Sequence, residues 1–174
     1  MTQLEKPVIG GETFVSLIAG RHPNGELIIE KILANPQPQE NSFQLLKSPM
    51  FVRGIARADV IQQLENTQGA FKVLQHSGNL CIRVFSKNAF STAALEPVEQ
   101  ALVSGIEKLG GDLDIKEDKA LVFSIHVSCG FDAVEKIMQE AIGQRDDVAW
   151  YYGNVYDPET GEPLNWWQSL LAPE

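Results

Sequence analysis

Residues 95–128 read LEPVEQALVSGIEKLGGDLDIKEDKALVFSIHVS, a helix-like segment followed by two strand-like segments. From Val98 to Leu109, apolar residues recur at three- and four-residue spacing, which predicts an amphipathic helix. Pro97 suits the first turn of that helix, and the glycine pair at 110–111 ends it. This stretch therefore predicts a chain that leaves a helix and enters a sheet.

The two strands of this stretch differ in polarity. GDLDIKED (111–118) predicts a short acidic edge strand, and ALVFSIHVS (120–128) predicts a buried one. Outward from them lie a strand, NLCIRVFSK (79–87), a second amphipathic helix, FDAVEKIMQEAIGQ (131–144), and a last strand, VAWYYGNVYD (148–157). This order is the ferredoxin-like βαββαβ pattern, in which two helices cover one face of a four-stranded antiparallel sheet.

The residues before this pattern alternate between short strands and turns. Strands are predicted for TFVSLIAG (13–20), ELIIEKILAN (26–35), SFQLLKS (42–48), DVIQQLE (59–65) and GAFKVLQHSG (69–78). Several short antiparallel strands without a long helix indicate a small barrel or a strongly curled sheet. The expected fold class is therefore α+β. A β-barrel-like subdomain over 1–78 precedes a ferredoxin-like subdomain over 79–158 and a C-terminal tail over 159–174.

The composition is that of a globular protein, with 44% hydrophobic and 21% charged residues. No apolar run is long enough to span a membrane, and the start MTQLEKPVIGGETF lacks the basic and apolar regions of a signal peptide. Cys81 and Cys129 both lie in apolar runs, which is typical of free buried thiols. We therefore expect a cytoplasmic protein with no membrane contact.

The net charge of −9 belongs entirely to the second half of the chain. Residues 1–78 hold seven acidic and seven basic residues, whereas residues 79–174 hold sixteen acidic and seven basic ones. Nucleic-acid binding requires clustered Lys and Arg, so this distribution argues against it. The charge suits a basic protein partner, or it serves solubility alone.

Pairs of carboxylates mark the acidic half. They are Asp112, Asp114, Glu117, Asp118, Asp146 and Asp147. The two-residue period of a strand places Asp112 and Asp114 on one face, where a divalent ion or a general acid–base pair is conceivable. An acidic edge strand that prevents edge-to-edge association is favoured over a metal site, and contact with a partner is compatible with it.

The tryptophans all fall after residue 149. On the last strand, Tyr151 faces away from Trp150 and Tyr152, so one of the two sets must leave the helix-covered core. A short tail cannot easily bury both Trp166 and Trp167. Exposed Tyr151, Trp166 and Trp167 would be typical of a binding hot spot. The alternative is a tail that packs its tryptophans so as to seal the two halves together.

No convincing catalytic or metal site is present in the sequence. The three histidines share no metal-binding spacing, and the common zinc, nucleophile, phosphate-binding and dinucleotide motifs are missing. Cys129 precedes a helix, which can lower a thiol pKa, but the nearby charges are acidic and would raise it. His126 could border a polar groove, although a structural role is favoured. We expect no cofactor and no catalytic residue.

The segment SPMFVRGIARADVI (48–61) resembles the hallmark of a bacterial domain-of-unknown-function family, number 4265. Members of that family share a phenylalanine-x-x-glycine-isoleucine segment, here Phe51 to Ile55, and a glycine-aspartate step before a βαββαβ-like second half. Ala58 stands where the family usually has the glycine of that step. The resemblance extends over about residues 13–157, and it implies no activity.

Together these features predict a non-catalytic protein-binding module, specifically an immunity protein that neutralises a basic bacterial toxin such as a nuclease effector. The alternative is a small-molecule-sensing regulatory domain, because a ferredoxin-like sheet and a cleft between subdomains both offer ligand sites. A cysteine- or metal-dependent hydrolase based on Cys129, His126 and the carboxylates ranks third. A thermal-shift screen with metabolites and metals separates sensing from protein binding.

Overall fold

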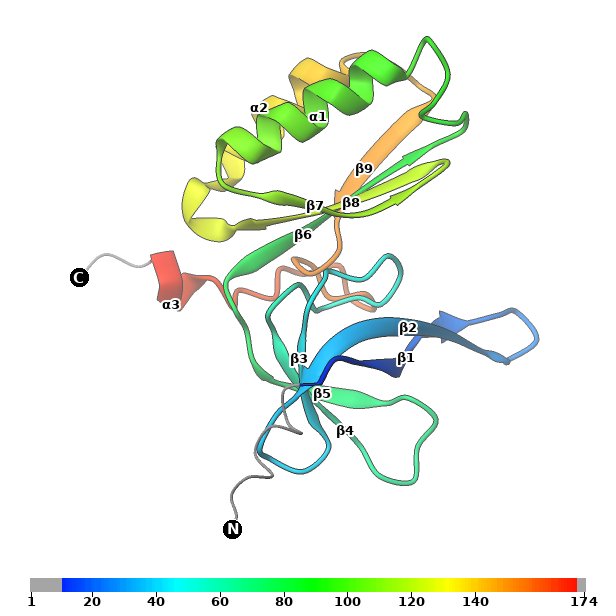
Figure 1. The fold of residues 1–174 in the computed structure, drawn as a ribbon, viewed down its shortest axis with the longest axis vertical. Helices are drawn as coiled ribbons and strands as arrows, with labels where there is room; N and C mark the ends of the chain where they lie inside the picture. Colours follow the sequence, from blue (N-terminus) through cyan, green and yellow to red (C-terminus); the bar gives the residue numbers. More distant parts are fainter. Residues whose placement is uncertain (1–10, 172–174) are drawn as a thin grey trace.

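The computed structural model describes residues 11–171, which form two antiparallel sheets and three α-helices (Figure 1). The α+β class expected from the sequence is confirmed. A five-stranded sheet is built from the first half of the chain, and a four-stranded sheet carries two helices on the face that points away from the first sheet (Figure 1). The two sheets therefore lie in successive layers under a helical layer.

The first sheet follows chain order. Its strands are β1 (Thr13–Arg21), β2 (Leu27–Pro36), β3 (Ser42–Leu45), β4 (Val60–Gln63) and β5 (Phe71–Gln75). Each strand pairs antiparallel with the next. The sheet curls so far that the amide of Ile18 on β1 donates to the carbonyl of Gly69, just before β5, at 3.0 Å.

This curled sheet is not a closed barrel, which corrects the barrel-like expectation. Within residues 11–171, no ladder joins β1 to β5. Because β3, β4 and β5 hold only four or five residues each, they are too short to continue the ladder around to β1. The concave side still encloses a core of buried residues, namely Val15, Leu17, Ile32, Ala34, Leu45, Val52, Ile55 and Ile61.

The second sheet has the order β7-β8-β6-β9. Its strands are β6 (Asn79–Ser86), β7 (Asp112–Glu117), β8 (Ala120–His126) and β9 (Val148–Tyr152). Helix α1 (Glu96–Lys108) connects β6 to β7. A short 3-10 turn, η2 (Val127–Cys129), leads from β8 into helix α2 (Phe131–Ile142), which connects to β9. The element order expected from the sequence is present.

Both helices bury the apolar faces that their periodicity predicts. Helix α1 buries Val98, Leu102 and Ile106, and helix α2 buries Val134, Met138 and Ile142. The two helices approach closely at Gly105, where a Cβ atom would lie 2.8 Å from the side chain of Ile137. The helices and the sheet share one large core, so the second half supplies most of the buried apolar surface.

Strand β9 ends at Tyr152, five residues before the end expected from the sequence. The reason is Asn154, whose side chain replaces backbone pairing at this point. Its Oδ1 accepts from the Cys81 amide at 2.9 Å, and its Nδ2 donates to the Asn79 carbonyl at 2.9 Å. The chain then turns through an isolated bridge between Tyr156 and Pro163 and ends in the short helix α3 (Gln168–Leu171).

Residues 1–10, which belong to the expected first subdomain and include most of the sequence start discussed above, lie outside the described residues, as do residues 172–174 of the tail. Across residues 11–171, no helix has the length and apolarity needed to cross a membrane.

Candidate functional site

The face of the second sheet that is free of helices is covered by the segment between β3 and β4 (Figure 1). Strand β6 points Leu80, Ile82 and Val84 toward the helices and the alternate residues toward this segment. We call residues 48–57 the bridging segment, because they belong to the first half of the chain and pack on the sheet of the second half. Three charged side chains hold this segment in place.

Arg83 is the first of these, and it is fully buried. Its guanidinium group donates to the carbonyl of Pro49 at 3.2 Å and to the carbonyls of Phe51 and Val52. The ring of Tyr151 lies over the guanidinium group, with 5.9 Å between the guanidinium carbon and the ring centroid. Gly153 makes room for Arg83, since a Cβ atom there would lie 2.7 Å from the guanidinium carbon.

Glu30 on β2 binds the same segment from the other side. Its carboxylate accepts from three consecutive amides, those of Met50, Phe51 and Val52, at 2.7 to 2.9 Å. The backbone around Phe51 is therefore fixed by an anion at its amides and by a cation at its carbonyls. Hydrogen bonds on both sides thus fix the position of the backbone that carries Phe51.

Asp114 is the third charged group, and it lies buried on β7 at a bulge between Leu113 and Ile115. Its carboxylate accepts from the Ser48 amide at 2.8 Å and from the Ser124 hydroxyl at 2.5 Å. Burial raises the pKa of this carboxyl, while these hydrogen bonds and Arg57 oppose the rise. Asp114 thus binds the chain's own bridging segment.

Asp112 and Asp114 are brought together, as the two-residue period predicts, because both contact the same nitrogen of Arg57. The distances are 2.8 Å to Asp112 and 3.3 Å to Asp114. Arg57 comes from the bridging segment, so this acidic pair joins the two halves of the chain. Asp112 is exposed, whereas the buried Asp114 offers little surface to a partner.

The other four acidic candidates gather at the far end of the second sheet, around the loop 86–90. The amides of Ser86 and Phe90 donate to the carbonyls of Lys119 and Asp118, and the amide of Lys87 donates to the carbonyl of Asp147. These bonds place the turn after β7 and the turn before β9 side by side. We call Glu117, Asp118, Asp146 and Asp147 the acidic end.

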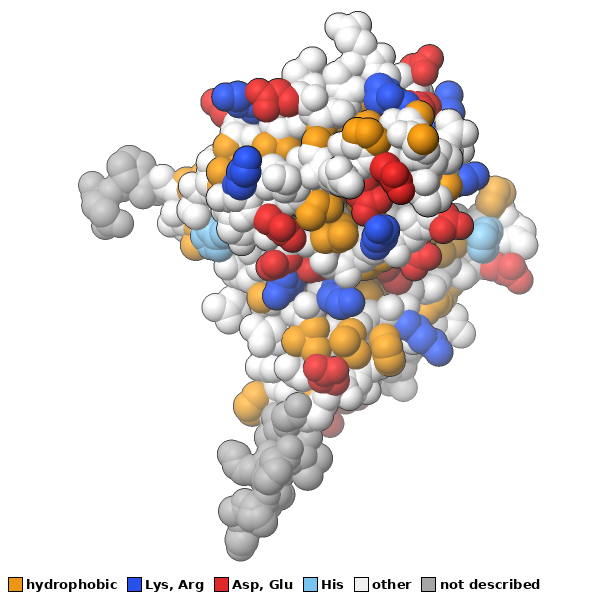
Figure 2. All heavy atoms as spheres, turned by 45° about the horizontal axis from the view of Figure 1, so that its top comes forward, with side chains coloured by type: hydrophobic (Ala, Val, Ile, Leu, Met, Phe, Trp, Pro, Cys, Tyr) orange, Lys and Arg blue, Asp and Glu red, His pale blue; other side chains and the backbone are white. Residues whose placement is uncertain are grey.

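The acidic end also contains basic groups. Arg145 forms two hydrogen bonds with Asp147, both at 3.0 Å, which lower the pKa of that carboxyl. Lys116 pairs with Glu99 at 2.7 Å. Figure 2 shows acidic and basic side chains interspersed over the face that includes the helical layer. Within residues 11–171, Glu117, Asp118 and Asp146 form no ion pair, and the exposed cations Lys87 and Lys119 belong to the same loop and turn.

The two tail tryptophans are half-buried and make contacts within the chain. Trp166 donates through Nε1 to the Asn154 carbonyl at 2.8 Å and stacks on His76 of the first half, with ring centroids 5.2 Å apart. Trp167 meets Phe131 edge-on at 5.3 Å. Trp166 therefore contacts both halves, as the sealing alternative requires, and each indole still exposes part of its surface.

The groups considered for catalysis do not come together. His126 is exposed and bonds Ser128 through Nδ1, while Cys129 lies in η2. Burial raises the pKa of the Cys129 thiol and of the Cys81 thiol, which disfavours the nucleophilic thiolate. Within residues 11–171, no three His, Cys, Asp or Glu side chains are placed to hold a metal ion.

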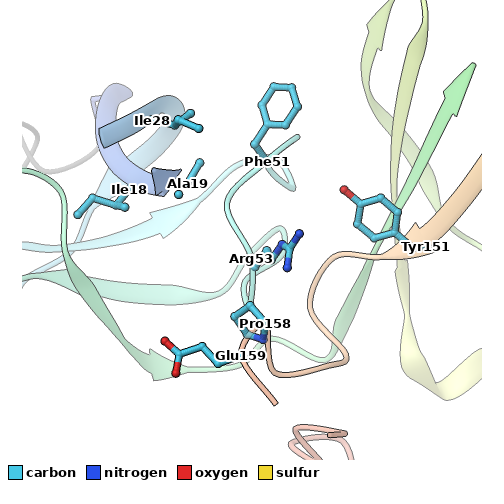
Figure 3. Close-up of a pocket in the computed structure, with 9 residues that line it drawn as sticks. Ile18, Ala19, Ile28, Phe51, Arg53, Tyr151, Pro158 and Glu159 are labelled. Carbon is cyan, nitrogen blue, oxygen red and sulfur yellow. The ribbon is translucent and has the colours of Figure 1, made fainter. Parts of the chain in front are cut away.

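A pocket of about 670 Å³ opens where the bridging segment, β1, β2 and β9 meet (Figure 3). It is lined by Ile18, Ala19, Gly20, Ile28, Phe51, Arg53, Tyr151, Pro158 and Glu159. Its residues come from both halves of the chain, and its volume lies in the range of small-molecule sites. Of the residues singled out in the sequence for binding, Tyr151 alone lines it.

Arg83, Glu30, Phe51 and Arg53 were not predicted as functional residues. One signal was available for Arg83, since LCIRVF places a single charge in phase with Cys81 on a strand that is otherwise apolar. A charge in that position is buried against a partner or exposed on an open face. The sequence offered no comparable signal for Glu30.

A family model described as "Domain of unknown function (DUF4265)" matches residues 30–150, a range that includes Glu30, the bridging segment and the acidic strand. This chain belongs to the DUF4265 family. The resemblance expected from residues 48–61 is confirmed. A comparison with curated proteins produced no match.

One solved structure, titled "Novel crystal structure of a hypothetical protein from Neisseria gonorrhoeae", has a similar fold. The TM-score is 0.64 at 14% sequence identity, over 82% of this chain and 94% of that one. At this identity the likeness extends to the fold alone. The arrangement of two sheets found in this DUF4265 member is therefore shared with a protein of distant sequence.

Proposed function

We propose that this protein is a non-catalytic protein-binding module, specifically a cytoplasmic immunity protein that neutralises a basic bacterial toxin such as a nuclease effector. The observation that carries the proposal is the acidic end, where carboxylates from two separate turns lie around the loop 86–90. Unpaired exposed carboxylates attract a basic partner over several ångströms and accelerate its association. Burial raises the pKa of the Cys81 and Cys129 thiols, which disfavours the thiolate that cysteine catalysis requires.

We propose that the chain has two subdomains with different roles. The first subdomain, over residues 1–78, is a strongly curled sheet that supplies the bridging segment. The second, over residues 79–158, is a ferredoxin-like subdomain that supplies the acidic end. Residues 159–174 are the tail, whose described part contacts both. Glu117, Asp118 and Asp146 would contact the partner, with Asp112, Asp147 and the exposed parts of Tyr151, Trp166 and Trp167 as further candidates.

Pull-down from the native host with the tagged full chain tests this proposal. We expect a basic protein to be retained at low salt and released as the salt concentration rises. The triple variant Glu117→Lys, Asp118→Lys, Asp146→Lys should slow association with that protein by about tenfold or more. The control is the double variant Glu26→Lys, Glu65→Lys, which reverses the charge of two exposed side chains in the first half. It should leave the association rate nearly unchanged. Equal rates for both sets of variants would remove the acidic end from the interface.

A small-molecule-sensing role is the second candidate, and the pocket between the two sheets favours it. A ligand that contacts residues of both halves stabilises their contact and can report its presence to a partner. This role does not depend on the acidic end, since none of its four carboxylates lines the pocket.

A further inference from the structure

The pocket between the sheets combines an apolar wall with the cationic side chain of Arg53. Ile18, Ala19 and Ile28 form one wall, and they belong to the β1–β2 hairpin (Figure 3). The opposite side carries Phe51, which is 50% exposed, and Tyr151, which is 40% exposed. Exposed aromatic side chains that face an apolar wall across a pocket are typical of ligand-binding sites.

The aromatic side of the pocket is a stacked series. Phe51 and Phe85 have ring centroids 6.3 Å apart with 20° between their planes, and Phe85 and Tyr151 have centroids 5.9 Å apart with 21° between their planes. Arg83 supports Tyr151 from below and fixes the carbonyl of Phe51. Both exposed rings thus pack against the half-buried Phe85, so less conformational entropy is lost when a ligand contacts them.

Arg53 supplies the positive charge. Its side chain and that of Tyr151 point toward one another from the two halves of the chain (Figure 3). Among residues 11–171, no carboxylate lies within ion-pair distance of the Arg53 guanidinium group. The carboxylate of Glu159, which also lines the pocket, points away from Arg53 (Figure 3). An exposed guanidinium group beside an aromatic surface matches a planar carboxylate on an apolar body.

We propose that this pocket binds a small carboxylate with an aromatic body, whose carboxylate pairs with Arg53 and whose ring packs between Phe51 and the wall of Ile18, Ala19 and Ile28. This inference deepens the second candidate function and is independent of the acidic end. The hydroxyl of Tyr151 is a further hydrogen-bond donor for the carboxylate. Glu159 at the rim opposes the binding of an anion and so lowers the affinity.

The test is titration of the full chain with 3-phenylpropionate and with phenethylamine, followed by amide chemical shifts. The first probe carries a carboxylate and the second an ammonium group on the same body. We expect 3-phenylpropionate to shift the amides of Ala19, Phe51, Arg53 and Tyr151, and to bind more tightly than phenethylamine. Arg53→Gln should weaken its binding about tenfold, and Glu159→Gln should strengthen it.

Lys72→Gln is the matched control, because it removes an exposed positive charge on β5 outside the pocket. It should leave the affinity for 3-phenylpropionate unchanged. Tighter binding of phenethylamine would overturn the carboxylate assignment while leaving a sensing role in place. Absence of pocket shifts with both probes at millimolar concentration would overturn the site itself, and neither result would bear on binding at the acidic end.

Discussion

Arg83 is a fully buried cation whose partners are backbone carbonyls, whereas a buried arginine or lysine ordinarily pairs with a carboxylate. Transferring a guanidinium group from water into the interior costs free energy, which three carbonyls and the face of Tyr151 offset. Those carbonyls have left water as well and depend on Arg83. The residue therefore connects the sheet of the second half to the bridging segment of the first.

Replacing Arg83 by methionine keeps much of the volume and removes the donors. We expect Arg83→Met to lower the free energy of unfolding by about 3 kcal/mol, because buried carbonyls lose their partners. Urea denaturation measures the change. Arg53→Met is the control, since Arg53 is exposed, and it should change the free energy by less than about 0.5 kcal/mol. A stable Arg83→Met protein would mean that the carbonyls find other donors.

Asp114 should give stability a pH dependence of known sign. Its carboxyl has a pKa above the ordinary value of 3.8, mainly because of burial, so the folded state holds its proton more tightly than the unfolded state. Its contribution is then fully present below pH 3.8 and is lost as the pH rises through the raised value. We expect the stability of the wild type relative to Asp114→Asn to fall over that interval, in urea denaturation at a series of pH values. If the difference in free energy of unfolding between the wild type and Asp114→Asn stayed constant with pH, the raised pKa of Asp114 would be contradicted.

At the scale of elements, the turn from the bridging segment into β4 contains a residue in an unfavourable conformation. Ala58 has φ of 72°, in the left-handed region, and its amide donates to the Leu45 carbonyl at 2.8 Å. The tight turn thus forms although its residue carries a Cβ atom. A Cβ atom in this region costs about 1 kcal/mol.

We therefore expect Ala58→Gly to raise the free energy of unfolding by about 0.5 kcal/mol, since relief of strain exceeds the added entropy of the unfolded chain. Thermal or urea denaturation measures the gain. Ala101→Gly on the exposed side of α1 introduces the same residue into a helix and should destabilise by about 0.5–1 kcal/mol. If both variants lose stability equally, the conformation of Ala58 carries no strain.

The helices and strands were predictable from the sequence to the extent that local patterns determine them. Helix α1 was expected over 95–110 and runs from Glu96 to Lys108, because apolar spacing and the Gly110-Gly111 pair set its limits. Strand β9 was expected to reach residue 157 and stops at Tyr152, because the side chain of Asn154 bonds a strand distant in sequence. A contact of that kind leaves no local pattern.

At the scale of the whole molecule, the same distinction applies to the candidate sites. The period of a strand placed Asp112 and Asp114 together, but Arg57 and Ser48, which bind them, lie more than fifty residues away. The acidic end was visible as acidic turns, while its assembly around the loop 86–90 depends on sheet order. The pocket forms only where residues from both halves of the chain meet, and no local pattern marks such a meeting. Of its lining residues, the sequence therefore singled out Tyr151 alone for binding.

The contacts of Arg83, Asp114 and Trp166 couple the two halves energetically. If the first half unfolded alone, Arg83 and Asp114 would lose their backbone partners in the bridging segment. The two side chains would then either stay buried without partners or become exposed to water. Either outcome removes stabilisation from the second half, so neither half is expected to unfold by itself.

Two measurements of urea unfolding test this coupling. Tryptophan fluorescence reports on the second half, since all three tryptophans lie in 150–167, and hydrogen exchange of the β1–β5 amides reports on the first half. We expect the two transitions to coincide. A transition of β1–β5 at lower urea concentration would show two independent units. Arg83→Met should separate the two transitions if these contacts are the source of the coupling, because it removes the three hydrogen bonds from Arg83 to the bridging segment.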